Sequence, residues 1–343
     1  MNDKIRIGIV GAGSNTKAKH IPGFQAIDGV EIVSVCNRSL ASSTKVAEEF
    51  KIHMIYPNWL ELVQAPDSDA IMIGTWPNLH HPITMAALDA GKHVLCEARM
   101  ARDAAEARQM LQAAAAKPHL VAQIVPAPFT FQVDQTVKRL ITEGYLGEIL
   151  AVEIQDKRGF LDKEAPITWR QDFDLSGYNT MTLGIWVETL LRWVGPATRL
   201  SAMGKTFMKM RPDSDTGQLQ AVRIPEHLDV IAELACGAQA HIGLSQVSGF
   251  SDSFGITLFG SQGTLQFNDG KLFGGQVGGL GLTEIKIPPH EQGGWRVEEE
   301  FINAIRGLEK VSYTTFEDGL KYMQFTEAVA RSIQEGRSIA LPL

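Results

Sequence analysis

Apolar residues recur in short blocks through the first third of the chain, and helix-like stretches separate these blocks. Continuous apolar runs of four to seven residues are typical of strands buried on both faces, as in a parallel sheet. An alanine-rich stretch over residues 103–116 has the length and composition of a helix. The predicted strands cover residues 5–10, 31–36, 69–74, 92–96 and 120–125. Their alternation with helices predicts an α/β domain with a doubly wound parallel sheet over residues 1–125.

The pattern changes after Pro126 and Pro128. Strand-like runs now follow one another across glycine or polar turns, which favours antiparallel pairing. Strands are predicted at 149–157, 200–209, 228–235, 238–245, 254–259, 264–268 and 285–287, with helices at 132–143, 296–306 and 316–334. We therefore expect an α+β domain with an open, largely antiparallel sheet over 126–343, whose C-terminal helices can pack back on the first domain. The glycine-rich segment 273–281 is predicted to be a mobile loop.

Composition and charge exclude several classes of protein. Of the 343 residues, 44% are hydrophobic and 21% charged, as in ordinary globular proteins, and the net charge of −7 argues against nucleic-acid binding. No apolar run reaches the ~18 residues of a membrane span, and residues 1–4 lead into a strand without a secretory segment. We expect a cytoplasmic protein that binds neither nucleic acid nor membrane. Its three cysteines, Cys36, Cys96 and Cys236, are expected to be buried, reduced thiols, and we predict no metal site.

The first predicted strand ends in a glycine turn. Gly11 and Gly13 follow it directly, while Thr16 occupies the third position of the G-x-G-x-x-G pattern. Glycine lets the backbone approach a pyrophosphate, which then accepts from amides at the start of the following helix, here near Ser14 and Asn15. The turn and the strand that follows about 20 residues later predict a dinucleotide-binding Rossmann domain.

The residues after the second strand bear on the choice of cofactor. Proteins specific for NAD place an acidic residue there to bind the ribose hydroxyls, whereas this chain has Asn37, Arg38 and Ser39. Arginine and serine can hydrogen-bond a 2′-phosphate, so we predict that NADP(H) is favoured over NAD(H). Ser39 is also a suitable N-cap for the next helix, and the two roles are compatible.

Two further segments resemble the Gfo/Idh/MocA (glucose–fructose oxidoreductase/inositol dehydrogenase) family. Residues 75–81 resemble its Thr-Pro-Asn-x-x-His loop, and residues 91–100 resemble its Gly-Lys-His-Val-Leu-Cys-Glu-Lys-Pro-Leu segment. The pattern His20-x-Pro22 is also similar to that of the family. The resemblance implies that Thr75, Trp76, Pro77, Asn78, His81, Glu97 and Ala98 lie at the cofactor. It also implies a homodimer or homotetramer formed through the open sheet, and a small-molecule substrate of the sugar or cyclitol type.

The three positions at which the family carries its catalytic residues differ in this chain. The family's lysine is replaced by Ala98, and its helical Asp-x-Gly-x-His becomes Thr182-Leu183-Gly184-Ile185-Trp186. Oxidation of an alcohol needs a group that accepts the hydroxyl proton, worth on the order of 10²–10⁴ in rate, and none of these residues is suited to this alone. The usual family mechanism is therefore not expected here.

Other residues are candidates for these roles. For acid–base catalysis we select Tyr178, Lys157 and Asp172, with His241 as a further possibility. Substrate-binding candidates can supply bidentate hydrogen bonds or a stacking surface, and they are Arg99, Arg158, Arg170, Thr182 and Trp186. Tyr178 can instead pack against Trp169, and Trp186 can instead belong to the core.

Three functions remain open from the sequence. The first is an NAD(P)-dependent oxidoreductase that acts on a small polyhydroxylated or carbonyl substrate with non-standard acid–base residues. The second is a non-redox lyase or hydrolase, and the third is a protein that binds nucleotide and ligand without turnover. The glycine turn is compatible with all three.

Overall fold

The computed structural model describes residues 4–343, and residues 1–3 of the N-terminal segment considered above lie outside it. The described chain divides into two compact units. The first contains the residues up to Pro126 together with Arg296–Leu320, and the second contains Ala127–Trp295 together with Lys321–Leu343. Among the described residues, no helix is both long and apolar enough to cross a membrane. The two units are considered separately below.

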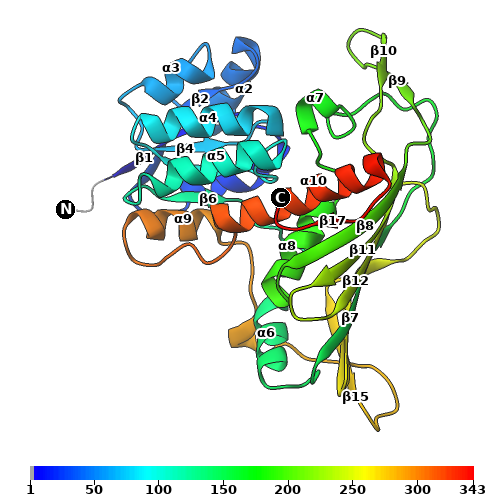
Figure 1. Ribbon diagram of the computed structural model, residues 1–343. Coiled ribbons are helices and arrows are strands. Elements are labelled where there is room, and N and C mark those ends of the chain that lie inside the picture. The colour runs from blue at the N-terminus through cyan, green and yellow to red at the C-terminus, as the bar shows by residue number, and fades with distance from the viewer. Residues whose placement is uncertain (1–3) are drawn as a thin grey trace. The chain divides into compact units, whose positions relative to one another are not determined.

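The first unit is built on a six-stranded parallel sheet with the strand order β3-β2-β1-β4-β5-β6 (Figure 1). This order is that of the Rossmann fold, and the predicted fold class is confirmed. The strands are β1 (Ile5–Val10), β2 (Val30–Cys36), β3 (Met54–Ile55), β4 (Ala70–Ile73), β5 (His93–Cys96) and β6 (Ala122–Ile124). The central strands are apolar on both faces, and Ile7, Ile9, Ile71, Ile73 and Leu95 are fully buried, as the continuous apolar runs predicted.

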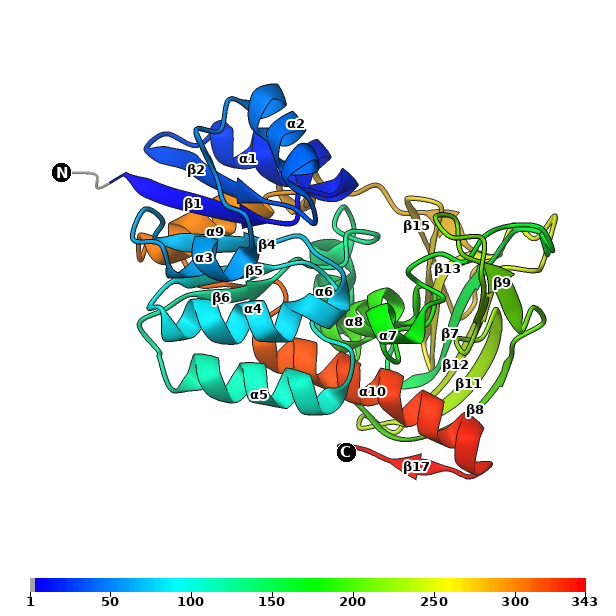
Figure 2. The ribbon, with the colours of Figure 1, turned by 90° about the horizontal axis from the view of Figure 1, so that it is seen from above.

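Helices cover both faces of this sheet (Figure 2). One layer contains α3 (Trp59–Gln64), α4 (Pro77–Asp89) and α5 (Ala104–Ala115), which contact one another in that order. On the other face, α1 (Ile21–Gln25) contacts α9 (Val297–Ile305), and α2 (Leu40–Phe50) packs on β2 and β3. The π-helical turn η1 (Thr16–His20) leads directly into α1. Segment 296–320 therefore belongs to the first unit although it lies near the end of the chain.

The second unit contains a nine-stranded sheet with the order β16-β15-β14-β13-β7-β12-β11-β8-β17, and a separate pair, β10-β9. Its strands are β7 (Ile149–Lys157), β8 (Ala197–Lys205), β9 (Met210–Pro212), β10 (Leu219–Ala221), β11 (His227–Leu234), β12 (Gln239–Ser245), β13 (Phe254–Gly260), β14 (Gly263–Asn268), β15 (Lys271–Gln276), β16 (Thr283–Glu284) and β17 (Ile339–Ala340). The sheet is antiparallel, as expected, except where β7 and β12 pair in parallel at its centre. That pairing joins two antiparallel halves, β16-β15-β14-β13-β7 and β12-β11-β8-β17.

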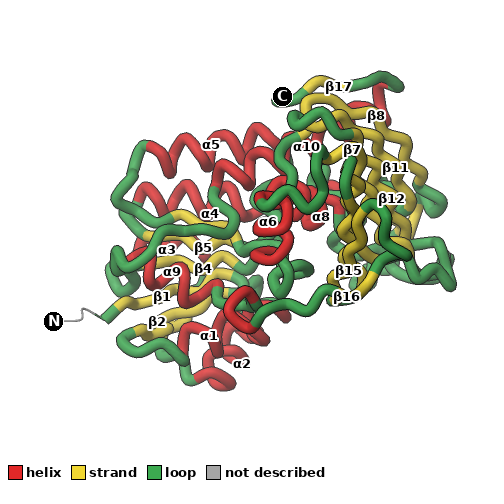
Figure 3. The backbone as a smooth tube through the Cα atoms, turned by 90° about the horizontal axis from the view of Figure 1, so that it is seen from below, coloured by secondary structure: helices red, strands yellow, loops and turns green. Residues whose placement is uncertain are grey.

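Helices line one face of the nine-stranded sheet (Figure 3). The second unit contains α6 (Asp134–Thr142), α7 (Phe173–Ser176), α8 (Leu183–Trp193), the short η2 (Pro289–Glu291) and residues 321–335 of α10 (Phe316–Glu335). Residues 152, 154 and 156 of β7 are buried, whereas the alternate residues 153, 155 and 157 are not. Strand residues alternate between the two faces, so the latter set lies on the face away from α8. Met203 and Ile231 lie on that same face, with exposures of 81% and 53%.

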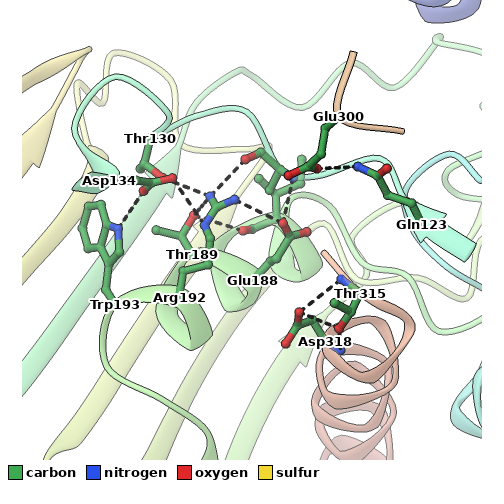
Figure 4. A network of polar contacts seen from close by, with 12 residues as sticks. Gln123, Thr130, Asp134, Glu188, Thr189, Arg192, Trp193, Glu300, Thr315 and Asp318 are labelled. Atoms are coloured by element: carbon green, nitrogen blue, oxygen red, sulfur yellow. Dashed lines mark hydrogen bonds and ion pairs between the residues drawn. The ribbon is translucent and has the colours of Figure 1, made fainter. Parts of the chain in front are cut away.

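A buried polar network joins α6 to α8 (Figure 4). The indole Nε1 of Trp193 donates to Asp134 over 2.7 Å, and Arg192 donates to the carbonyl of Ala127 and pairs with Glu188. The Glu188 carboxylate also accepts from the amide of Ala127. Glu188, Arg192 and Trp193 thus hold α8 against α6 and the residues before it.

Three local predictions are wrong in whole or in part. Residues 273–276 of the predicted loop belong to strand β15, where an added Cβ at Gly274 would lie 2.7 Å from the Tyr145 hydroxyl, so glycine here allows close approach within a strand. Only residues 277–281 form a turn, which connects β15 to β16. The short strand predicted at 285–287 lies instead at Thr283–Glu284, where it pairs with Phe273 and Gly274, and it is not the final strand, which is β17. Cys236 is exposed, since it lies in the turn between β11 and β12.

Candidate active site

The glycine turn at the end of β1 is held by contacts with the neighbouring strands. Gly11 has φ +87°, and its amide donates to the carbonyl of Cys36 at the end of β2. An added Cβ at Gly11 would lie 2.7 Å from the amide nitrogen of Thr75, so this glycine is required by packing and by backbone conformation. Thr16, at the third motif position, donates its hydroxyl hydrogen to the carbonyl of Gly11. This hydrogen bond explains how the turn closes without a third glycine.

Gly13 differs from Gly11 because the protein itself does not require it. An added Cβ would meet only the carbonyl oxygen of Gly74, at 3.7 Å, which is ordinary van der Waals contact. A glycine that is not needed for packing keeps the surface of the turn clear for a bound group. The helical segment begins at Ser14, directly after this surface, so the turn fits the pyrophosphate of a dinucleotide.

The residues after β2 divide their roles. The Asn37 side chain accepts from the amide of Ala12 over 2.7 Å and donates to the carbonyl of Ser42, so it links the glycine turn to α2. Ser39 accepts from the amide of Ser42, which confirms its predicted role as N-cap. Arg38 lies between them with an exposed side chain. Arg38 and Ser39 are both exposed and so accessible to a ligand, whereas Asn37 is half-buried.

Thr75, which follows β4, and the first turns of α4 carry buried polar atoms that lack a partner within the described residues. These atoms are Thr75 Oγ1, Asn78 Oδ1 and His81 Nε2. A buried polar group without a hydrogen bond is costly, and a bound ligand is one way to satisfy it. All three lie at the carboxyl end of the sheet, where ligands of open α/β folds bind, and they fit the nicotinamide end of a dinucleotide. Trp76, which departs from the family pattern, is 38% exposed beside them.

His80 is a buried residue in the same first turns of α4 that the sequence did not single out. Its two ring nitrogens each lie 2.9 Å from a backbone carbonyl, one of Thr75 and one of Arg99. Burial lowers the pKa of His80 and outweighs these hydrogen bonds. The residue therefore joins the loops that follow β4 and β5. Only the tertiary contacts distinguish it from the adjacent His81.

The segment after β5 contains Glu97, Ala98 and Arg99. The Glu97 carboxylate accepts from the side chains of Asn15 and His20. Arg99 is buried in the first unit, with 7% exposure, and the Ala98–Arg99 peptide is cis. Burial raises the pKa of the Cys96 thiol well above its usual range, so this cysteine is a packing residue and not a reactive one.

In the second unit the two substituted family positions meet at one buried carboxylate. Thr182 donates its hydroxyl hydrogen to Asp156 Oδ2 over 2.7 Å, and the Trp186 indole donates to the same oxygen over 3.3 Å. Arg158 donates to the other oxygen through Nε and Nη2, at 2.9 and 2.6 Å. Asp156 is 4% exposed, whereas Thr182 is partly exposed. Thr182 is thus the accessible end of a hydrogen-bonded pair with a buried carboxylate.

Asp156 was not among the site residues predicted from the sequence, although a signal was present. Val152, Ile154 and Asp156 occupy the same face of β7, and the two apolar members mark that face as buried. A carboxylate on a buried face requires donors, and a functional role is one common reason for its presence. The structure supplies those donors from α8 and its N-terminus.

Trp186 does not present its ring to a ligand. It is fully buried and packs between Phe129 and Phe254, with ring centroids 5.3 and 5.2 Å away. The predicted stacking of this side chain on a sugar ring is therefore wrong, because no face of the indole is accessible. Its contribution to the site is the hydrogen bond to Asp156.

The other predicted catalytic residues are not brought to Asp156. Lys157 follows it on β7 and so points to the opposite face of the sheet, over Gly243. His241 lies on that same face and pairs with Asp229. Asp172 accepts from the amide of Asp174 and is the N-cap of α7.

Tyr178 and Arg170 border two pockets of the second unit that share Ile224 and Pro225. Tyr178 lines one of about 340 Å³, and its ring packs edge-on against Phe173, not against Trp169. Arg170 lines the other, of about 330 Å³, and its guanidinium lies 4.2 Å above the Trp169 ring. Neither pocket is lined by Asp156.

A Rossmann unit with this glycine turn, joined in one chain to an open-faced sheet, is the architecture of two-domain nicotinamide-dependent oxidoreductases. Residues 5–124 match the oxidoreductase family with an NAD-binding Rossmann fold (GFO_IDH_MocA), and residues 135–266 match the GFO/IDH/MocA C-terminal domain. The chain belongs to the Gfo/Idh/MocA family and is an NAD(P)-dependent oxidoreductase.

Individual relatives with a named activity are similar to the chain at low sequence identity. The chain is similar to levoglucosan dehydrogenase of Pseudarthrobacter phenanthrenivorans, with 25% identity over 77% of this chain and 73% of that protein. It is also similar to D-xylose 1-dehydrogenase (NADP(+)) of Hypocrea jecorina, with 31% identity over 50% of this chain and 46% of that protein. A solved structure of levoglucosan dehydrogenase with NADH and L-sorbose shares the fold, with a TM-score of 0.85, 21% identity, and coverage of 98% and 99% of the two chains.

Proposed function

We propose that this protein is an NADP(H)-dependent dehydrogenase that interconverts a hydroxyl and a carbonyl on a small polyhydroxylated molecule of the sugar or cyclitol type. The observation that carries the proposal is the nucleotide turn: Gly13 leaves its surface open, and unpartnered polar atoms of Thr75, Asn78 and His81 lie at the carboxyl end of the same sheet. When bound there, the nicotinamide supplies the hydride chemistry. The sugar and NADP names of two relatives support the substrate class and the cofactor.

The preference for NADP(H) rests on the charge at the end of β2. Asn37 is engaged with the turn, so the ribose-binding position offers no carboxylate to repel a 2′-phosphate. The exposed guanidinium of Arg38 and the hydroxyl of Ser39 can donate to phosphate oxygens. NADH lacks that phosphate, so it offers the Arg38 guanidinium no anion to pair with at this position.

We assign the proton transfer to Asp156 and Thr182, in place of the lysine, aspartate and histidine of the family pattern. The Thr182 hydroxyl donates to Asp156, so its lone pairs can accept a hydrogen bond from a substrate hydroxyl. In oxidation, the substrate proton moves to Thr182 Oγ1 as the Thr182 proton moves to Asp156 Oδ2. Arg158 and Trp186 hold the carboxylate in place for this transfer. Tyr178 stays a prediction as an acid–base residue, and Lys157 and Asp172 are less suited by their positions.

The open face of the sheet supports self-association. Met203, Ile231 and Phe259 are exposed apolar side chains on strands β8, β11 and β13. Burying such residues against a second copy of the chain would remove apolar area from water. A homodimer or homotetramer formed through this face is the proposed assembly.

The first test is calorimetric titration of the nucleotide-free protein with NADPH and with NADH. Micromolar or tighter binding with NADPH preferred supports the proposal, and it is followed by absorbance assays of reduced nicotinamide with levoglucosan, D-xylose, L-sorbose and myo-inositol. Tighter binding of NADH would contradict the cofactor assignment alone. Absence of binding to either nucleotide would contradict the proposed function.

A further inference from the structure

We propose that His20 is a positioning residue of the nucleotide site: as an imidazolium between Glu298 and Glu97, it fixes the Glu97 carboxylate beside Asn15 of the glycine turn. The inference rests on the proposed function, because it assigns Glu97 and Asn15 to the nucleotide site. It adds a connection from that site to α9, near the other end of the chain.

Each ring nitrogen of His20 contacts a different carboxylate. Nδ1 lies 2.5 Å from Glu298 Oε1 and Nε2 lies 3.1 Å from Glu97 Oε1, while the ring itself is fully buried. A carboxylate can only accept, so both nitrogens donate, and the ring then carries two protons and a positive charge. Asn15 donates to the same Glu97 oxygen, and the other oxygen accepts from the Ala98 amide. Three groups, His20, Asn15 and the Ala98 amide, thus orient one carboxylate at the edge of the site.

Helix α1 leaves room for the Glu298 side chain at Gly23. Gly23 lies three residues after His20, on the same side of the helical segment. An added Cβ at Gly23 would lie 2.7 Å from the Glu298 carboxylate, so any larger residue would displace it. Glycine at this position allows α9 to approach closely enough for the carboxylate to contact the ring.

The balance of charge favours the doubly protonated ring. The charged groups that face it are Glu97 from the end of β5 and Glu298 from α9. Burial alone would lower the pKa of His20, but its hydrogen bonds with these carboxylates prevail and raise it to about 9. Burial likewise opposes ionisation of Glu97, and the bonds from His20 and Asn15 nevertheless lower its pKa.

Loss of the imidazolium therefore has a specific consequence. Without its charge, the buried Glu298 carboxylate and the partly buried Glu97 carboxylate have no cation between them, and like charges on the two sides of one ring repel. Glu97 then moves away from Asn15, and the start of the helix at the pyrophosphate turn loses a hydrogen bond. We expect weaker nucleotide binding by a protein that is still folded.

The experiment compares full-length wild type with His20→Gln, using calorimetric titration with NADPH at neutral pH. The matched control is His53→Gln, which alters an exposed histidine of the same unit. We expect an affinity loss of about tenfold or more for His20→Gln and none for His53→Gln. Wild-type affinity should also fall as pH rises through the His20 pKa of about 9, and His20→Gln should lack this fall.

Each result decides a separate question. Wild-type binding with unchanged affinity and pH profile in His20→Gln would overturn the inference and leave the proposed function standing. A wild type that binds no NADPH would overturn the proposed function and the inference with it. Where His20→Gln fails to fold, by circular dichroism, Glu298→Gln is titrated instead. A loss of affinity then supports the positioning role, and an unchanged affinity overturns it.

Discussion

Restoring the family's histidine at position 186 is expected to destabilise the second unit. The Trp186 side chain is fully buried, and its ring lies between Phe129 and Phe254 with centroids 5.3 and 5.2 Å away. Histidine at this position would leave part of that aromatic cluster without a neighbour. An imidazole can still donate to Asp156, so the main loss is one of packing.

The magnitude follows from size and burial. Histidine is smaller than tryptophan by roughly 70 Å³, and at about 24 cal/mol per Å³ of residual cavity this costs about 1.7 kcal/mol. The lost burial of roughly 60 Å² of side-chain surface adds about 1.5 kcal/mol at about 25 cal/mol per Å². We expect Trp186→His to lower the free energy of unfolding by about 3 kcal/mol.

The assay is urea unfolding followed by circular dichroism and by tryptophan fluorescence. A chain of two units can unfold in more than one step, so a single free energy is taken only where the two probes coincide. Trp169→His is the matched control in the same unit, because Trp169 is not fully buried. Its effect should be clearly smaller.

A loss below about 1 kcal/mol for Trp186→His would refute the reasoning, since it is less than the cavity cost alone. The cluster would then be able to close around the smaller ring. A loss equal to that of Trp169→His would also count against it, because burial is the difference on which the prediction rests.

Four further predictions concern the cofactor, the proton transfer, the assembly and the dependence on pH. Arg38→Ala should weaken NADPH binding by about 1.5–3 kcal/mol in calorimetry and leave NADH binding unchanged, whereas equal losses would show that Arg38 does not bind the 2′-phosphate. Thr182→Val and Asp156→Asn should each lower kcat on an identified substrate by on the order of 10²–10⁴ without changing NADPH affinity, and an unchanged kcat would remove them from the mechanism. Ile231→Lys should shift the molar mass in light scattering toward the monomer, and an unaltered mass would place the interface elsewhere. Because folding raises the His20 pKa from 6.5 to about 9, the stability that this residue contributes is complete below about pH 6.5 and is lost as pH rises through about 9. A free energy of unfolding that does not change between these pH values would contradict this prediction.

Much of the fold could be predicted from the sequence because its signals are local. The apolar runs of the first unit and the alternation in β7 and β11 depend only on neighbouring residues, and they predict strands that the structure confirms. The turn at Gly11 likewise carries its own conformational requirement. Short strands such as β15 were missed because their glycines are explained by Tyr145, which lies far away in the sequence.

The candidate site was predicted only in part, for a related reason. The sequence determined which positions of the family pattern had changed, among them Thr182 and Trp186, but it did not determine what these residues would contact. Their common partner, Asp156, lies 26 residues before Thr182 on another element, and Glu298 lies 278 residues from His20. Periodicity identifies which face of an element is buried, whereas the neighbour on that face depends on how distant elements pack. Only the tertiary structure decided that a carboxylate faces each of these sites.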